Sequence, residues 1–338
     1  MSKYIRGEDR EELLANIAEM YYVKEYSQVD IAHAVGVTRS AVSRMLKEAK
    51  GKGIIELRIR HPLQFDEALA HSLQRRFALR SAYVLAREKE TDYGELRARL
   101  GKAAAQVLTG ILTPQGALGV AWGTTVSATI AALEVKERIP LKAVQLVGVL
   151  GSSSHASNAQ ALVQTLAGKL GGEGVYMYTP LIVDSEGTAR SLRNSDSVRT
   201  AIEAGKHCDA ALLGIGTTEP DYCALYQGGH ISRGTLEALR RAGAVGDVSA
   251  HFYGLDGRAT DTDFHNRLIG IGLDDLLAIP TRLGVAGGRV KARAILGALR
   301  GQYINVLVTD SPTAALVLEL DESTLLANGD SHEPGSPS

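Results

Sequence analysis

Apolar residues recur with the period of an α-helix along the first fifty residues. The interval 8–26 predicts a first helix, and the interval 27–50 predicts two shorter helices joined by a turn. The inward-facing positions are three or four residues apart: Leu13, Leu14, Ile17, Met20 and Tyr21 in the first helix, Ile31, Ala32 and Val35 in the second, and Val42, Met45 or Leu46, and Ala49 in the third. This spacing predicts a small three-helix unit.

The turn between the second and third predicted helices has the residues that a helix-turn-helix needs. Ser27 can cap the second helix, and Asp30 can return a bond to the Ser27 N–H, as in a capping box. Gly36 stands where the turn requires a positive φ or no side chain, and Thr38 can cap the third helix. With the small Ala32 where the helices cross, this spacing is typical of a helix-turn-helix.

The outer face of the third predicted helix carries polar and basic side chains. Between residues 39 and 60 there are seven Lys or Arg and two acidic residues, in a chain whose net charge is −1. The alternative is an ordinary solvated surface, but the motif and the local charge both favour DNA binding. We therefore predict a double-stranded DNA operator as partner, read in the major groove by Gln28, Thr38, Arg39, Ser40, Ser43, Arg44 and Lys47.

The pattern changes after residue 50. Residues 55–59 alternate between apolar and charged, which predicts one strand that ends at Pro62 and makes a winged arrangement plausible. Residues 65–77 predict a helix with apolar positions at four-residue steps, whose apolar side packs either on its own core or on a second subunit.

From residue 81 onward, short apolar runs alternate with helical periods. Strands are predicted at 82–86, 117–121, 143–150, 174–178, 209–215, 283–286 and 304–310. Helices are predicted at 94–112, 125–135, 158–170, 198–204, 235–242, 291–299 and 313–320. This alternation predicts an α/β fold with a Rossmann-like, mostly parallel, doubly wound sheet. We expect a first domain over 1–62, a second over 63–326, and a disordered tail over 327–338 that is rich in Gly, Ser and Pro.

Composition narrows the function classes. The 338 residues are 45% apolar and 22% charged, which is typical of a globular protein. No run reaches the eighteen apolar residues of a membrane span, and the first residues lack the apolar core of a secretion signal, which predicts a cytoplasmic protein. Cys208 and Cys223 are the only cysteines and the nine histidines lack ligand spacing, so no disulfide framework, metal or cofactor is expected.

Five loops at predicted strand ends carry polar chemistry: 119–130, 148–155, 214–222, 244–258 and 284–295. In open parallel sheets, ligands bind at the carboxyl ends of the strands. Gly123, Thr124 and Thr125 precede a helix, which favours a phosphate, while Asp247 can accept bonds from hydroxyl groups. The alternative for Lys291 is a surface helix residue, and for Asp247 a turn residue that bonds its own backbone. Neither a Walker A motif nor a full GxGxxG occurs, so together the loops predict a small anionic polyol as ligand.

The chain resembles the SorC family of bacterial sugar-binding transcriptional regulators. The resemblance covers residues 10–320 and rests on motifs in a fixed order: SQVDIAHAVGVTRSAVSRMLKEAKGKGIIELRI, GVAWGTT, GIGTTEPDY, AVGDVSAHFYGLDG, LGVAGGRVKARAI and INVLVTDSPTAALVL. It implies a helix-turn-helix domain, an effector domain similar to sugar-phosphate isomerases, and assembly as a homo-oligomer, usually a tetramer. It also implies that Gly123, Thr124 and Thr125 hold a phosphate and that Asp247 and Lys291 contact the effector. With Gly216 and Thr217 of the 214–222 loop, these residues make up the predicted effector site. Some relatives have a lysine soon after the QL of the third strand that could form an imine with an aldehyde sugar. This chain has Val147, which argues against a covalent effector there.

The sequence thus predicts a DNA-binding transcriptional regulator of carbohydrate metabolism, not an enzyme, that responds to a phosphorylated sugar or polyol. Two alternatives stay open. One is a sugar-phosphate isomerase-like enzyme, with Asp247 or Glu219 as base and Lys291 stabilising developing charge. The other is a metabolite-binding module without a DNA role.

Overall fold

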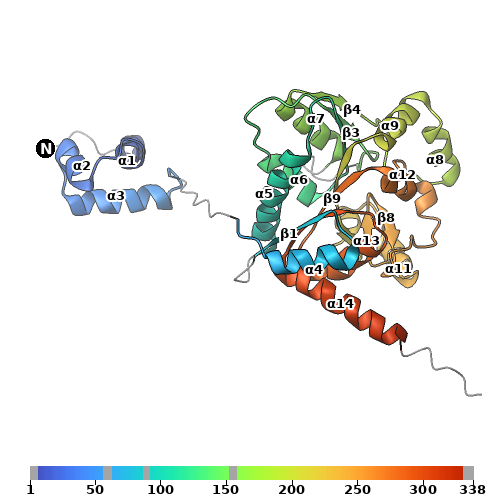
Figure 1. The fold of residues 1–338 in the computed structure, drawn as a ribbon. Helices are drawn as coiled ribbons and strands as arrows, with labels where there is room; N and C mark the ends of the chain where they lie inside the picture. Colours follow the sequence, from blue (N-terminus) through green and yellow to red (C-terminus); the bar gives the residue numbers. More distant parts are fainter. Residues whose placement is uncertain (1–6, 56–62, 87–91, 152–157, 330–338) are drawn as a thin grey trace, which may run out of the picture. The chain divides into compact units, whose positions relative to one another are not determined.

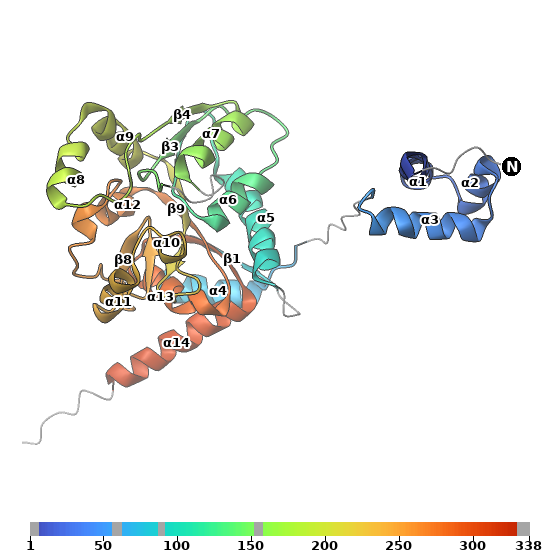
Figure 2. The same ribbon diagram turned by 180° about the vertical axis from the view of Figure 1, so that it is seen from behind.

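The computed structural model describes residues 7–55, 63–86, 92–151 and 158–329. The chain divides into two compact units, residues 1–62 and residues 63–338, and each is described by itself. Figures 1 and 2 show the helices of the first unit and the helix-covered sheet of the second from opposite sides.

The first unit consists of three helices, α1 (Gly7–Tyr22), α2 (Gln28–Val35) and α3 (Arg39–Gly51). The three predicted helices are therefore confirmed. The first ends four residues before the predicted boundary at residue 26, and Glu25 then has a φ of 57°, which is incompatible with a continuing right-handed helix.

The capping residues of the first unit act as predicted, with one correction. Gly36 has a φ of 71° at the end of α2, and Thr38 Oγ1 accepts a hydrogen bond from the Ala41 N–H at the start of α3. Ser27 Oγ accepts from the Asp30 N–H, as expected. The Asp30 carboxylate, however, accepts from the Ser27 hydroxyl at 2.6 Å instead of from the Ser27 N–H, because the hydroxyl lies within reach on the same helix end.

The core of the first unit contains Ile17, Ile31, Ala32, Val42 and Leu46. Leu46 is buried and Met45 is partly buried, which decides between the two inward-facing candidates. The predicted strand of residues 55–59 lies, apart from Ile55, outside the described residues.

The second unit is built on a seven-stranded sheet in which every pairing is parallel, in the order β1-β10-β9-β5-β2-β3-β4. The strands are β1 (Ser81–Leu85), β2 (Ala117–Val120), β3 (Lys142–Gln145), β4 (Glu173–Val175), β5 (Ala210–Gly214), β9 (Thr281–Val285) and β10 (Val306–Asp310). At the centre of the sheet, Leu212 pairs with Val120 on one side and with Leu283 on the other. All seven predicted strands are present, although β3 and β4 are shorter than expected.

Helices cover both faces of this sheet, as Figures 1 and 2 show. The α-helices described in this unit are α4 (Glu67–Phe77), α5 (Tyr93–Ile111), α6 (Thr124–Ala132), α7 (Ala159–Leu170), α8 (Glu186–Arg193), α9 (Asp196–Lys206), α10 (Ala224–Gln227), α11 (Arg233–Arg241), α12 (Leu273–Ala278), α13 (Ala292–Arg300) and α14 (Ser311–Gly329). Alternate residues of β5 divide between two hydrophobic clusters: Ala210 and Leu212 pack with α5–α7, whereas Ala211 and Leu213 join the cluster that contains α13. The predicted doubly wound α/β architecture is confirmed.

The first and last helices of the second unit, α4 and α14, bear on two predictions. Ala70 and Leu73 of α4 are buried in the unit's own core, so the apolar side of this helix packs there. Helix α14 continues to Gly329 and includes residues 327–329, which were assigned to the tail. Residues 330–338 lie outside the described residues.

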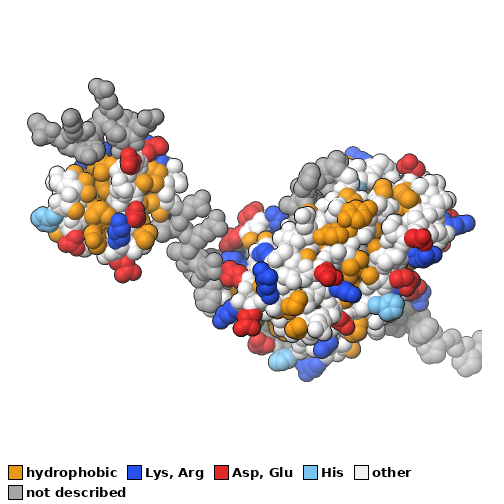
Figure 3. Space-filling model, turned by 90° about the horizontal axis from the view of Figure 1, so that it is seen from above, with side chains coloured by type: hydrophobic (Ala, Val, Ile, Leu, Met, Phe, Trp, Pro, Cys, Tyr) orange, Lys and Arg blue, Asp and Glu red, His pale blue; other side chains and the backbone are white. Residues whose placement is uncertain are grey.

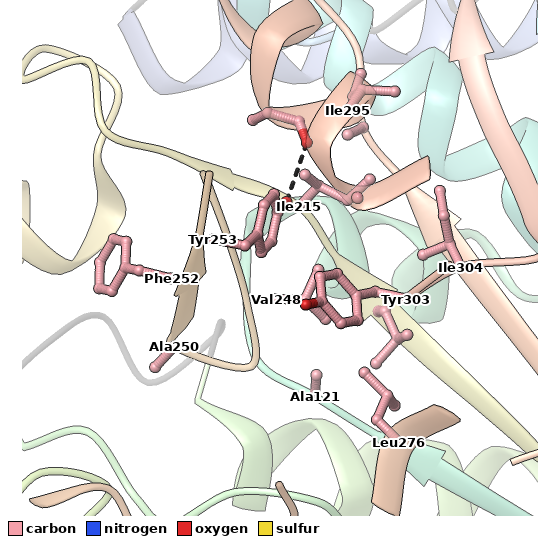
Figure 4. Packing of buried hydrophobic residues seen from close by; sticks show 14 of the residues in the cluster. Ala121, Ile215, Val248, Ala250, Phe252, Tyr253, Leu276, Ile295, Tyr303 and Ile304 are labelled. Atoms are coloured by element: carbon pink, nitrogen blue, oxygen red, sulfur yellow. Dashed lines mark hydrogen bonds between the residues drawn. The ribbon is translucent and has the colours of Figure 1, made fainter. Parts of the chain in front are cut away.

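The sequence analysis missed a small antiparallel sheet made of β6 (Gly216–Thr217), β7 (Gly246–Val248) and β8 (His251–Tyr253). Strands of two or three residues are too short to give an alternating pattern. Figure 4 shows Phe252 and Tyr253 of β8 among the buried side chains of this region, where Tyr253 Oη donates to the Ala294 carbonyl at 3.1 Å.

Candidate functional site

The predicted DNA-reading face lies on the exposed side of α3. Arg39, Ser40, Arg44 and Lys47 are exposed, whereas Val42, Leu46 and Ala49 of the same helix are buried. Among the other predicted DNA-binding residues, Thr38 is exposed, and Gln28 and Ser43 are half-buried. The structure therefore groups the predicted basic residues on one solvent-facing side of one helix.

The basic residues of this face differ from Arg10 of α1 in having no acidic partner among the described residues. Within the described part of the first unit, no ion pair engages Arg39, Arg44 or Lys47. By contrast, Arg10 and Glu48 join α1 to α3 at 2.6 Å, which raises the pKa of Arg10 and lowers that of Glu48 through their mutual hydrogen bond. These three unpaired cations lie on the exposed face of α3, where a phosphate backbone would supply the negative charge.

Large hydrophobic side chains of the first unit are also exposed, namely Tyr22, Val23, Tyr26 and Val29. They belong to the end of α1, the following turn and the start of α2. Figure 3 shows one face of this unit, on which hydrophobic side chains lie at the surface.

In the second unit, the sheet order brings three of the predicted loops together. Strand β5 lies between β2 and β9, so the segments that follow these three strands meet at one edge of the sheet. The contacts agree with this: a Cβ placed on Gly214 would lie 3.4 Å from the Trp122 carbonyl oxygen and 3.6 Å from Thr125 Oγ1. The carboxyl edge of β2, β5 and β9 is therefore the candidate effector site.

The Gly123–Thr124–Thr125 loop begins α6. Gly123 has a φ of 131°, and no side chain caps the first N–H groups of α6. Thr124 is exposed, whereas Thr125 is buried and donates its hydroxyl to the Val285 carbonyl of β9 at 2.9 Å. Uncapped N–H groups and the exposed Thr124 hydroxyl at a helix N-terminus are suited to an anion.

Lys291 is buried, with 9% of its surface exposed, in the 3₁₀ turn η3 (Arg289–Lys291) that precedes α13. Its Nζ donates to the Ile215 carbonyl at 2.6 Å, between β5 and β6. Burial lowers its pKa, and the nearby Asp247 acts in the opposite direction. The alternative of a surface helix residue is therefore contradicted.

Asp247 is buried in the middle of β7. Its Oδ2 accepts from the Ala250 N–H at 3.1 Å, so it does bond its own turn, as the alternative proposed. Burial raises its pKa to about 6, against the attraction of Lys291. A Cβ on Gly216 would lie only 1.8 Å from Asp247 Oδ1, so glycine is required for the carboxylate to occupy this position.

Thr217 faces away from this pair, because alternate residues of a strand point to opposite sides. Its hydroxyl accepts from the Glu219 N–H at 3.3 Å, and its side chain lines a separate cavity of about 210 Å³ with Val290 and Arg293. The side chain of Thr217, a predicted effector residue, therefore points away from Asp247.

The sequence analysis missed two buried groups beside this site. Cys223 is close enough to Asp247 and Lys291 to be affected by both charges, and burial raises its pKa to about 11. Asp310, at the end of β10, accepts from the Gly288 N–H at 2.7 Å and is fully buried. An acidic residue at the carboxyl end of a predicted strand was the signal that could have identified Asp310.

Two features of other function classes are absent from the described residues. No group of three or more His, Cys, Asp or Glu there is arranged to hold a metal ion. In the same part of the chain, no helix is both long and apolar enough to cross a bilayer.

A helix-turn-helix unit with a basic face, joined to an α/β unit with a buried polar site at its strand ends, defines the class of ligand-responsive transcriptional regulators. Comparison with known proteins agrees. The family model described as "Putative sugar-binding domain" matches residues 61–319. The chain belongs to the SorC family of sugar-binding transcriptional regulators.

Relatives and solved structures extend this match to both units. The transcriptional regulator LsrR of Klebsiella pneumoniae is 36% identical over 327 residues, which cover 92% of this chain and 94% of the relative. The deoxyribonucleoside regulator of Bacillus subtilis is 30% identical and covers 92% of this chain and 99% of its own length. The full-length sorbitol operon regulator SorC of Klebsiella pneumoniae superposes with a TM-score of 0.69 at 27% identity, covering 92% of this chain and 99% of that structure.

Proposed function

We propose that this regulator binds an operator through the exposed face of α3 and that a phosphorylated sugar or polyol, bound at the carboxyl edge of β2, β5 and β9, changes its operator affinity. The observation that carries the proposal is the buried pair of Lys291 and Asp247, together with the uncapped N-terminus of α6, which follows β2 at the same edge of the sheet as the loop after β9. Such a site combines groups for a phosphate with groups for hydroxyls. The predicted effector set of Gly123, Thr124, Thr125, Gly216, Asp247 and Lys291, with Thr217 at its margin, is part of this proposal.

The roles follow from chemistry and position. The N–H groups of α6 and the Thr124 hydroxyl would hold the phosphate, because both are free to donate to an anion. Asp247 would accept bonds from sugar hydroxyls, and Lys291 would contribute a positive charge where solvent is largely excluded. Since the relatives include regulators named for sorbitol and for deoxyribonucleosides, the sugar itself is best found by screening.

The DNA side of the proposal uses Arg39, Arg44 and Lys47 as unpaired cations. Thr38, Ser40 and Ser43 lie at the N-terminal end of the recognition helix, where base edges are reached, and Gln28 begins α2. We further propose a homo-oligomer, a tetramer as in the family, which would place two recognition helices on a palindromic operator.

Two measurements test this function. Titration calorimetry with a panel of pentose phosphates, hexose phosphates and phosphorylated hexitols, each paired with its unphosphorylated sugar, identifies the effector class. Gel-shift titration of the DNA upstream of the gene, with and without the compound that binds, then measures the regulation. Binding of the unphosphorylated sugars alone would contradict the phosphate role of the α6 loop.

We also propose that the protein has no isomerase turnover. The relatives are named as regulators, and Glu219, one of the two candidate bases, is half exposed and pairs with Arg240 at 3.5 Å instead of facing Lys291. Asp247 is the remaining candidate base. Product formation from any sugar phosphate that binds, lost in Asp247→Asn, would support the enzyme alternative.

A further inference from the structure

Asp321 of α14 is a buried carboxylate that joins three helices. Only 3% of its surface is exposed. Its Oδ1 accepts from Arg300 Nη2 at 2.6 Å and from Arg300 Nε at 2.9 Å, and its Oδ2 accepts from Arg76 Nε at 2.5 Å. Arg300 is the last residue of α13, and Arg76 belongs to the last turn of α4.

This junction is sensitive to the placement of its helices. A buried carboxylate needs well-placed hydrogen-bond donors to offset its lost hydration, and here two guanidinium groups from different helices supply them. A small shift of either helix would lengthen one set of bonds and leave part of the charge uncompensated. The junction therefore favours one arrangement of α4, α13 and α14 over its neighbours.

Two continuous links run from the candidate effector site to this junction. Helix α13 starts directly after Lys291 and ends at Arg300, nine residues and about 13 Å further along its axis. Helix α14 starts directly after Asp310, the last residue of β10, and the Oδ2 of Asp310 accepts from both the Gly288 N–H and the Thr313 hydroxyl at 2.7 Å. The loop that carries Lys291 is thus attached at one end to α13 and at the other to α14. Figures 1 and 2 show α4, α13 and α14 side by side on one side of the sheet.

Helix α4 lies at the other side of the junction and is the first helix after residues 56–62, which connect the two units in the chain. We propose that the Asp321 junction with Arg76 and Arg300 transmits effector binding to the DNA-binding unit: the effector changes the position of the Lys291 loop, α13 and α14 carry the change, and Arg76 passes it to α4. This inference rests on the proposed function. In this proposal, Arg76, Arg300 and Asp321 couple the effector site to the DNA-binding site without contacting the effector or the DNA.

Arg76→Gln is the most direct test, because Arg76 is 41% exposed and its loss leaves Arg300 on Asp321. The matched control is Arg75→Gln, which removes the same charge from the preceding, exposed residue of the same helix. Three quantities are measured: the affinity for a pentose phosphate, hexose phosphate or phosphorylated hexitol that binds the wild type, without DNA; the operator affinity alone; and the operator affinity with that compound at saturation.

For Arg76→Gln, we expect the first two affinities to stay within about twofold of the wild type and the ratio of operator affinities with and without the compound to fall at least about fivefold toward one. Arg75→Gln keeps the wild-type ratio, and Arg76→Lys restores part of it. Asp321→Asn is the second variant and should show the same loss. Because coupling free energies are reciprocal, the affinity for the compound in the presence of operator must change by the same factor.

A wild-type ratio in both Arg76→Gln and Asp321→Asn overturns this inference and leaves the proposed function intact. A fall in either ligand's affinity when measured alone, without a change in the ratio, also overturns it, because the role is then structural. A wild-type protein that binds these compounds in calorimetry but shows the same operator affinity with and without them overturns the proposed function and this inference together.

Discussion

The two units place their positive charges in opposite environments. In the first unit, Arg39, Arg44 and Lys47 are exposed and, within the described residues, have no acidic partner. In the second, Lys291 is buried, bonded to the Ile215 carbonyl and close to Asp247. The first arrangement suits a large polyanion that displaces counterions, and the second suits one small ligand recognised by position.

This difference teaches how the same residue type gives two kinds of recognition. An exposed cation interacts through water and is weakened by salt, so several are needed and each contributes little. A buried cation has lost its hydration, so its bonds are strong and its position is specific. Variants of the two sites should therefore differ in magnitude, in salt dependence and in pH dependence.

The largest effect should come from Asp247→Asn on the pH dependence of stability. Burial raises the pKa of Asp247 to about 6 from an ordinary 3.8, so the fold favours the protonated form. The stability from this group is complete below about pH 4 and is lost as the pH rises through 6. Relative to wild type, the free energy of unfolding of Asp247→Asn, measured in urea, should rise by about 3 kcal/mol between pH 4 and pH 7. The control is Asp256→Asn, because the side chain of Asp256 is exposed. If the difference in unfolding free energy between Asp247→Asn and the wild type did not change with pH, the raised pKa of Asp247 would be contradicted.

Lys291→Met should weaken effector binding about 100-fold, because it removes a buried charge-assisted donor. Operator affinity without effector should stay within about twofold. Calorimetry with the phosphorylated compound and gel shift measure the two values. Arg289→Met, two residues earlier in the same 3₁₀ turn and exposed, should leave both unchanged; an equal loss in the two variants would place the ligand elsewhere.

Arg44→Ala should weaken operator binding about tenfold and reduce the slope of log affinity against log salt by about one. Effector affinity should not change. The control is Lys24→Ala, an exposed lysine that pairs with Glu19 before α2. An unchanged affinity and slope in Arg44→Ala would remove this residue from the interface.

The smallest effect should be a change in the fluorescence of Trp122, the only tryptophan, when the effector binds. Its carbonyl lies beside Gly214 and the residue precedes the α6 loop, so an effector there should alter the emission. The measurement is a fluorescence titration compared with calorimetry on the same protein. If calorimetry detected binding and the fluorescence emission of Trp122 did not change, the effector pocket would lie away from this loop.

Much of the fold could be predicted because its signals are local. The helix-turn-helix follows from caps and spacing within 27–50, and Gly36 has the positive φ that its place in the turn required. The central strands β2 and β5 are largely buried on both faces, which gives continuous apolar runs. By contrast, β6, β7 and β8 form through pairing with segments elsewhere in the chain, so they have no periodic sequence pattern from which they could be predicted.

The candidate site was predicted in part, for the same reason. Lys291 and Asp247 were identified by their places after strand-like runs, and the structure buries them close to each other. The direction of Thr217 depends on the register of β6 with β7, which a sequence does not reveal. Nor do Arg76 and Asp321, 245 positions apart, carry any local sign that they meet.

By itself, the sequence determined the two-part organisation, the helix-turn-helix and the strand-helix alternation, because caps, turns and apolar periods act between residues that are close along the chain. Only the tertiary structure decided which charges are buried, which loops share an edge and which helices a single carboxylate joins. Those outcomes depend on the strand order β2-β5-β9 and on packing between segments that are hundreds of residues apart, and desolvation of a charge exists only once such packing is complete.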